Sequence, residues 1–119
     1  MLEITEQDIQ DIIDYNKSIN ETEWWVKENL LNSAFSSYYY YEELLEQICS
    51  VFRGIVKNHP FSNANKRTSA MILAFLLDKY GYSISDENLI DITLDVAGNN
   101  YEVEEIAQKL SQMIEDEIM

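Results

Sequence analysis

The sequence predicts an all-α protein that forms a single domain over residues 1–119, with about six helices. Apolar residues make up 46% of the chain, which is enough for a buried core at this length. Only three glycines and one proline occur, and this scarcity disfavours a turn-rich β architecture. Apolar residues also recur at helical spacing along most of the chain.

The first three helices are predicted over roughly 6–18, 23–34 and 40–58. Thr5 stands where it can cap the first helix, whose buried face would carry three isoleucines: Ile9, Ile12 and Ile13. The third carries a long apolar stripe, from Leu44 to Val56. A residue before proline is pushed out of the right-handed α region, so this helix is expected to end at Asn58 or His59.

The fourth predicted helix covers about 64–80 and is apolar on most sides, so it is expected to be central and buried. Gly81 is placed to end it in a left-handed conformation. Ser85 is expected to begin a fifth helix. Asn99 or Asn100 would begin a sixth, amphipathic helix that continues to the end of the chain.

The charge balance excludes several classes of partner. The formal net charge is −14, which argues against nucleic-acid binding and against anionic membranes. The first residues carry acids where a signal peptide needs cations, and no apolar run is long enough to span a membrane. Cys49 is the only cysteine, so we interpret it as a small buried residue in a reducing compartment. These features predict a cytoplasmic protein.

The acids avoid one part of the chain. Eleven lie in residues 1–46 and eleven in 78–119, whereas 47–77 contains none. The side chains there that carry or can accept positive charge are Arg53, Lys57, His59, Lys66 and Arg67. Core helices carry few charges of either sign, which accounts for the missing acids. It does not explain why every remaining charge is positive.

The stretch HPFSNANKR, residues 59–67, holds the only histidine and the only proline. It reads as a helix end, a short loop and the start of the next helix. A helix N-terminus presents unpaired N–H groups and partial positive charge, which suits phosphate. Ala64 allows close approach of a ligand, Asn65 can donate an amide hydrogen bond, and Lys66 and Arg67 add positive charge.

The other residues of this stretch suggest complementary roles. Histidine exchanges protons near neutral pH, so His59 is the candidate base. Phe61 has no such chemistry and is expected to anchor the loop in the core together with Pro60. A base beside a phosphate site indicates transfer of a phosphate-containing group to a hydroxyl. Each residue also has an ordinary structural interpretation, in which Ser62 or Asn63 simply caps the following helix.

The stretch resembles the signature of the Fic/Doc family, HPFx(D/E)GN(G/K)R, and its Ala-Asn-Lys-Arg form is closer to the Doc (death-on-curing) toxins. The matching positions are His59, Pro60, Phe61, Ala64, Asn65, Lys66 and Arg67. Flanking segments resemble Doc-like proteins too: LLNSAF at 30–35, the helix before the motif at 40–58 and the helix after it at 66–82. The resemblance thus covers nearly the whole chain.

The resemblance implies an all-helical fold and a transferase that uses ATP. His59 would deprotonate a hydroxyl of a target protein, and Ala64, Asn65, Lys66 and Arg67 would hold the nucleotide phosphates. Lysine at position 66 is typical of Doc-like protein kinases, which present the γ-phosphate, whereas glycine there is typical of AMP-transferring Fic enzymes. The implied partners are a protein substrate, with elongation factor Tu as the known Doc target, and an antitoxin that covers the site.

Two positions depart from the Fic pattern. Asn63 stands where the family has a metal-binding acid, so Mg²⁺ is expected to be held mainly by the nucleotide, with Asn63 as a weak ligand. Ala70 stands where AMP-transferring enzymes have a second arginine. SISDEN at 83–88 formally matches the family's inhibitory glutamate element, but capping by Ser85 explains it better.

The sequence is compatible with three functions: a Doc-like kinase toxin, a Fic-type AMP or nucleotidyl transferase, and a degenerate module that only binds a partner. The aromatic clusters, Trp24-Trp25 and the four tyrosines at 38–41, do not separate them. We interpret both clusters as packing residues rather than as a base-stacking or partner surface.

Overall fold

The computed structural model describes residues 1–20 and 23–116 and confirms the all-α class. Its helices, in chain order, are α1 (Glu6–Ile19), α2 (Glu28–Ser36), the 3-10 helix η1 (Ser37–Tyr40), α3 (Leu44–Asn58), α4 (Asn65–Lys79), α5 (Asp86–Gly98) and α6 (Val103–Ser111). Two short strands, β1 (Tyr82–Ser83) and β2 (Glu115–Asp116), pair antiparallel, with Tyr82 opposite Asp116.

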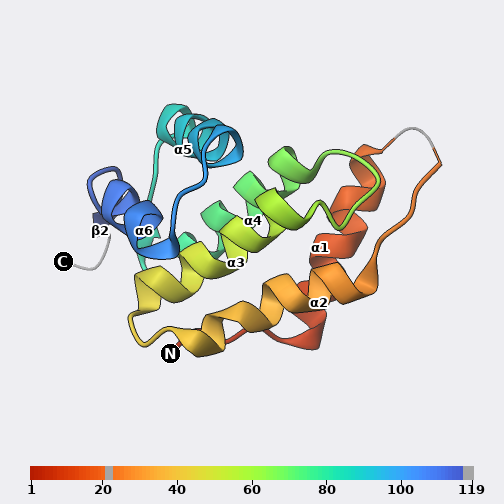
Figure 1. Cartoon of the computed structure of the whole chain (residues 1–119), viewed down its shortest axis with the longest axis horizontal. Helices are drawn as coiled ribbons and strands as arrows, with labels where there is room; N and C mark the ends of the chain where they lie inside the picture. Colours follow the sequence, from red (N-terminus) through yellow and green to blue (C-terminus); the bar gives the residue numbers. More distant parts are fainter. Residues whose placement is uncertain (21–22, 117–119) are drawn as a thin grey trace.

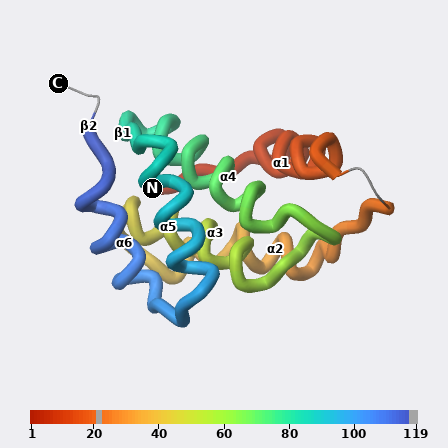
Figure 2. The backbone as a smooth tube through the Cα atoms, turned by 90° about the horizontal axis from the view of Figure 1, so that it is seen from above, coloured from red at the N-terminus to blue at the C-terminus, as the bar shows by residue number. Residues whose placement is uncertain are grey.

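Helices α3 and α4 pack against each other through the middle of the molecule (Figures 1 and 2). At one end, α2 lies along α3 and α1 lies along α4; at the other end, α6 contacts α3 and α5 contacts α4. The predicted central helix is therefore α4, and its partner α3 is the more completely buried of the two. The loop that joins α3 to α4 reaches toward α1 (Figure 1).

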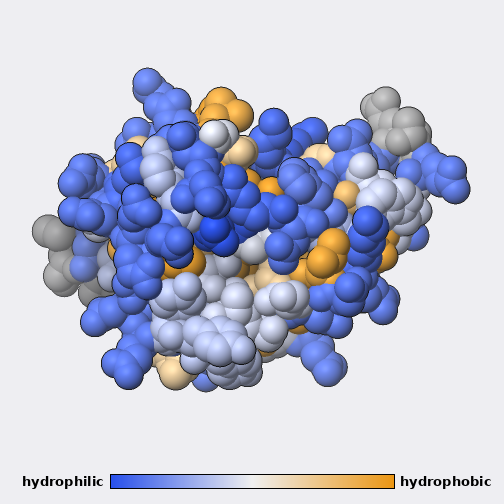
Figure 3. Space-filling model, in the orientation of Figure 1, coloured by the Kyte–Doolittle hydropathy of each residue, from blue (hydrophilic) through white to orange (hydrophobic). Residues whose placement is uncertain are grey.

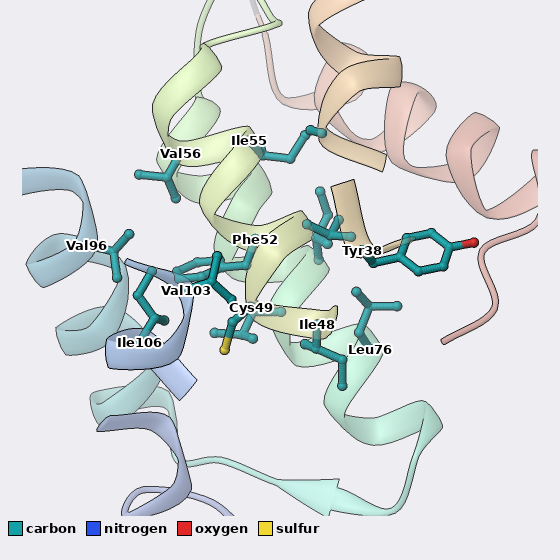
Figure 4. Packing of buried hydrophobic residues seen from close by; sticks show 14 of the residues in the cluster. Tyr38, Ile48, Cys49, Phe52, Ile55, Val56, Leu76, Val96, Val103 and Ile106 are labelled. Carbon is teal, nitrogen blue, oxygen red and sulfur yellow. The ribbon is translucent and has the colours of Figure 1, made fainter. Parts of the chain in front are cut away.

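The core is built around the apolar stripe of α3. Phe52 and Ile55 are fully buried there, and residues from α4, α5 and α6 pack around them (Figure 4). Cys49 belongs to this core and has no exposed surface, as expected. Burial raises the pKa of its thiol to about 12, so the group stays protonated and unreactive at neutral pH.

Several predicted helix ends are confirmed. The Thr5 hydroxyl accepts a hydrogen bond from the Asp8 N–H, and the Asp8 carboxylate accepts one from the Thr5 N–H, which forms a capping box. Partial burial opposes ionisation of Asp8, but these bonds and the Lys79 ammonium still lower its pKa. Ser85 caps α5 through the Asn88 N–H, and Gly81 follows α4 with a φ of 85°.

The second helix begins later than predicted. Residues 23–27 are not helical, because the backbone of this segment pairs with the loop after α3. Val26 forms an isolated antiparallel bridge with Phe61. Aromatic and β-branched residues favour extended backbone, and here a tertiary partner for that backbone is present. The prediction of a helix is therefore wrong for residues 23–27.

The third helix also begins later, at Leu44 instead of about residue 40. The preceding tyrosines form η1, in which the rings of Tyr38 and Tyr39 stack with their centroids 4.4 Å apart. Hydrogen bonding to Tyr39 and burial raise the pKa of Tyr38 to about 12. Tyr41 is extended, and its carbonyl accepts a hydrogen bond from the buried Gln47 side chain.

The sixth helix was predicted too long at both ends. Asn99 ends α5, where its side chain donates to the Asp95 carbonyl, and α6 begins only after Glu102. Helix α6 ends at Ser111, and the acidic Glu115 and Asp116 form a strand instead of a last helical turn. Acids at a helix C-terminus oppose the helix dipole, which favours this change. Residues 117–119 lie outside the described part of the chain.

The aromatic clusters are packing residues only in part. Trp24 is half-buried and Tyr38 is buried, in agreement with the prediction. Trp25, Tyr39 and Tyr40 are exposed, so burial in the core does not account for them.

Within residues 1–20 and 23–116, the helices are all too short or too polar to cross a lipid bilayer.

A close approach of α2 and α3 depends on Gly54. A Cβ atom at this position would lie 2.7 Å from the Cβ and 2.9 Å from the Cα of Ala34. Such distances are shorter than any real van der Waals contact, so a larger residue must push the two helices apart.

We predict that Gly54→Val lowers the free energy of unfolding by about 1–3 kcal/mol because it overpacks this contact. The measurement is urea denaturation followed by circular dichroism. Gly98→Val is the matched control, since a Cβ at Gly98 meets nothing within 4 Å. Equal stability of the two variants would contradict the contact between α2 and α3.

Candidate functional site

The loop between α3 and α4 begins and ends with a left-handed residue. His59 ends α3 with φ 48° and ψ 58°, and Ala64 precedes α4 with φ 61° and ψ 31°. Pro60 follows His59 and prevents the helix from continuing. This conformation costs non-glycine residues about 1–2 kcal/mol each, so the surrounding structure must hold both ends of the loop.

The Asn65 side chain holds the loop from inside. Its Oδ1 accepts a hydrogen bond from the Phe61 N–H and its Nδ2 donates to the Phe61 carbonyl, both at 3.0 Å. Phe61 is 1% exposed and lies in the core, and Pro60 is buried as well. The amide of Asn65, which the sequence suggested as a phosphate donor, is thus engaged in shaping the loop.

The segment before α2 holds the loop from outside. The Lys27 N–H donates to the Pro60 carbonyl at 2.7 Å, and the Ser62 N–H donates to the Trp25 carbonyl at 3.0 Å. The Ser62 hydroxyl accepts a longer hydrogen bond, 3.3 Å, from the Trp25 N–H. The extended segment at 23–27 therefore packs along one side of the loop through backbone hydrogen bonds.

A buried asparagine in α1 connects these parts. Asn16 has no exposed surface, and its Nδ2 donates to the Asn63 carbonyl at 3.1 Å and to the Thr68 hydroxyl at 2.8 Å. Its Oδ1 accepts from the Trp24 indole N–H and from the Asn20 amide, both at 2.9 Å. One side chain thereby joins α1, the loop, α4 and the segment before α2.

Asn16 was not among the residues predicted to belong to the site, although the sequence pattern contains a signal. Ile9, Ile12 and Ile13 define the buried face of α1, and position 16 continues the same face at helical spacing. A polar residue on such a face must find hydrogen-bond partners in the interior. That requirement predicts that Asn16 makes a tertiary contact, but it does not identify the partners.

The first turn of α4 has its N–H groups free for a ligand. Ala64 is the N-cap and provides no side-chain cap, so the ordinary structural interpretation, in which Ser62 or Asn63 caps this helix, is wrong. Asn63 instead accepts a hydrogen bond from the Ala64 N–H through its own Oδ1, at 2.8 Å. The first intrahelical bond joins the Thr68 N–H to the Ala64 carbonyl, which leaves the N–H groups of residues 65–67 pointing out of the helix end.

His59 and the residues that carry these N–H groups line one open hollow of about 430 Å³. Its lining comes from the loop and the first turn of α4: His59, Ser62, Asn63, Ala64, Asn65, Lys66 and Arg67. This lining contains no carboxylate, in a chain with 22 acidic residues. The structure thus brings together all the predicted base and phosphate-binding residues at one helix N-terminus with positive potential.

Four cations of the acid-free region fall into two groups. Arg53 donates from Nε to the Tyr101 carbonyl at 2.7 Å, and Lys57 donates to the Asn99 carbonyl at 2.5 Å, so both hold the connection between α5 and α6. Lys66 and Arg67 are exposed, and the salt bridges seen among the described residues involve other cations, Lys79 and Lys109. Only this second pair remains available to an anion in the hollow.

A metal ion would receive little from the protein here. Among the described residues, no group of three or more His, Cys, Asp or Glu side chains could hold one. Asn63 is exposed and offers one neutral oxygen, which already accepts the Ala64 N–H. This donor set offers a divalent cation one neutral oxygen, which is a weaker ligand than a carboxylate.

Comparison with known proteins identifies a family. Residues 4–77 match the sequence model of the Fic/DOC family, from before α1 to near the end of α4. The match includes the whole loop and Asn16, and it leaves α5 and α6 outside. A search of curated proteins found no match to the chain.

We predict that Asn16→Leu, which is nearly isosteric, lowers the free energy of unfolding by at least about 2 kcal/mol. Each buried polar group that loses its partner costs about 1–3 kcal/mol, and the Thr68 hydroxyl is fully buried. Urea denaturation measures the change. Asn32→Leu on the exposed side of α2 is the control and should stay within about 0.5 kcal/mol of the wild type. A stability of Asn16→Leu equal to the control would contradict the role of Asn16.

Proposed function

Because the chain belongs to the Fic/DOC family, whose members are generally transferases that modify other proteins, we propose that it is a Doc-like protein kinase. In this proposal it transfers the γ-phosphate of ATP to a hydroxyl of a target protein. One observation carries the proposal: His59 and the free N-terminus of α4 line the same acid-free hollow.

Each group of residues that lines the hollow has a role in this reaction. The imidazole of His59 takes the proton of the target hydroxyl as its oxygen forms a bond to the γ-phosphorus. The bond between that phosphorus and the bridging oxygen breaks, and ADP leaves. The N–H groups of residues 65–67, with Lys66 and Arg67, balance the phosphate charge in this proposal. Mg²⁺ would come with the nucleotide and neutralise part of that charge, with Asn63 as its one protein ligand.

Two residues favour phosphate transfer over AMP transfer. Lys66 is the side chain typical of the Doc branch, and it is exposed at the hollow. Ala70, one helical turn after it, carries no guanidinium, in contrast to the pattern of AMP-transferring enzymes. AMP or nucleotidyl transfer to a protein hydroxyl remains the second candidate, and a module that binds a partner without catalysis is the third.

The biological setting follows from the same resemblance. We propose that the protein is the toxin of a toxin–antitoxin module in the cytoplasm, with elongation factor Tu as its target and arrested translation as the result. An antitoxin protein would cover the hollow when the toxin is held inactive.

The test is transfer of label from ATP to purified elongation factor Tu and to a cell extract, in the presence of Mg²⁺. We expect label from γ-labelled ATP to enter protein and label from α-labelled ATP not to. His59→Ala should lower the rate about 10²–10⁴-fold, the range typical for loss of a general base. Gln108→Ala, on the exposed side of α6, is the control and should transfer at the wild-type rate.

Other outcomes would overturn the proposal in different ways. Transfer of the α-label alone would contradict the kinase and support the AMP transferase. If the wild type transferred neither label to any protein, the binding module would be favoured. If His59→Ala transferred as fast as Gln108→Ala, the assignment of the base would be wrong.

A further inference from the structure

One surface of this acidic molecule carries no charged side chain. Residues 29–41, which form α2 after its first residue, η1 and Tyr41, are the longest run of the sequence without Asp, Glu, Lys or Arg. The run is not hidden in the core, since its exposed members are Asn29, Asn32, Ser33, Ser36, Tyr39 and Tyr40. Figure 3 shows a broad pale area in its lower part, over α2 and η1, with mostly hydrophilic atoms around it. We call the exposed part of residues 29–41 the neutral face.

The neutral face borders a hollow of about 230 Å³ between η1 and α3. Ala34, Gly54 and Val103 give it apolar walls. Its polar lining includes Ser37, Ser50, Arg53 and Asn58. The residues that line it differ from those that line the hollow containing His59, so the two are separate sites.

The polar groups of this hollow suit a hydroxyl group on an aromatic ring. The Ser50 hydroxyl donates to Ser37, so its own oxygen can still accept a hydrogen bond. Arg53 donates from Nε to the Tyr101 carbonyl, and the salt bridges found within residues 1–20 and 23–116 do not include it. Its guanidinium can therefore contact the face of a ring or donate to a hydroxyl oxygen. Tyrosine is the side chain that meets both the apolar walls and these groups.

Tyr40 borders the hollow without filling it. It belongs to the lining and is nevertheless 88% exposed, so its ring makes little contact with its own chain. A cavity of about 150 Å³ is enough to hold a benzene ring, so the hollow has room for a tyrosine ring that comes from outside. A projecting tyrosine and a hollow that suits tyrosine thus lie side by side, which makes this surface complementary to itself.

We propose that the neutral face is the interface of a dimer of this chain, in which Tyr40 of each copy enters the hollow of the other. A two-fold axis brings the same surface of both copies together and repeats each contact, so this one pairing closes the dimer. The centres of protein interfaces are rich in aromatic residues and poor in charged ones, as the neutral face is.

The charge balance favours a second copy over a partner of opposite charge. A basic protein would be attracted to the acidic surfaces of the chain and not to its neutral face. A second copy has the same net charge of −14 and is repelled by those surfaces. Two copies can therefore approach each other most easily where both lack charge.

Acids around the neutral face set its expected response to salt. Burial raises the pKa of Tyr41, and the carboxylates of Glu104, Glu102 and Glu46 add to this effect, so these acids lie near the hollow. In the dimer the acids of the two copies come closer together, and salt screens their repulsion. The dimer should therefore become tighter as salt is added, in contrast to a complex held by opposite charges.

The experiment is sedimentation equilibrium of the full chain over a range of concentrations. Because the neutral face is small, we expect a weak dimer with a Kd on the order of 10–100 μM. The mean mass should rise from one chain toward two as the concentration increases. The Kd should fall when sodium chloride is raised from about 50 to about 500 mM.

Two variants test the residues involved, each with a matched control. Tyr40→Ala should raise the Kd at least about tenfold, because a buried aromatic contact is lost twice in each dimer. Ile90→Ala, at a large side chain on α5 that is 57% exposed, should keep the wild-type Kd. Ser33→Glu adds a carboxylate to the neutral face and should raise the Kd, whereas Gln108→Glu, on the exposed side of α6, should not. All four positions are exposed, and circular dichroism checks that each variant is folded.

Three results would overturn the inference. If the mass stayed that of one chain up to about 500 μM, well above the expected Kd, the neutral face would belong to a different protein partner. If Tyr40→Ala dimerised like Ile90→Ala, or Ser33→Glu like Gln108→Glu, the copies would meet elsewhere. If added salt weakened the dimer, opposite charges would hold it. The proposed function stands in each case, because the hollow with His59 is a separate site.

Discussion

The candidate site depends on the buried amide of Asn16. The loop at 59–64 starts and ends with residues in the left-handed region, a conformation that short loops do not hold by themselves. Asn16 fixes the loop to α1 and α4 at once, and Trp24 joins the same network from the other side. None of the buried side-chain N and O atoms in the described residues lacks a hydrogen-bond partner, so replacing one member of this network leaves its partners unpaired.

The fold explains how charge is distributed along the sequence. The acid-free region at 47–77 contributes buried faces of α3 and α4, which explains why it carries few charges. Arg53 and Lys57 serve the structure, because they bind carbonyl groups that end α5 and begin the connection to α6. Lys66 and Arg67 are left beside the helix N-terminus, where cations oppose the helix dipole unless an anion is bound. This local conflict is typical of a binding site.

Much of the fold could be predicted because its signals are local. The capping of α1 by Thr5 and of α5 by Ser85, the end of α3 before Pro60 and the turn at Gly81 all follow from residues within one turn of each boundary. The extended segment at 23–27 could not be predicted in this way, because its partner, the loop at 60–62, is distant in sequence. Likewise, the motif predicted which residues surround the hollow, whereas the hydrogen bonds of Asn16 depend on how the helices pack.

The proposed function requires that the N-terminus of α4 bind the phosphates of a nucleotide through backbone N–H groups. Its most direct test is a titration of ¹⁵N-labelled protein with ATP and Mg²⁺, followed by amide chemical shifts in NMR spectra. We expect the largest shifts at the amides of Asn65, Lys66 and Arg67. Shifts centred elsewhere, for example at the separate hollow between α1 and α4 lined by Tyr15, Met71 and Phe75, would contradict it, as would no shifts at saturating ATP.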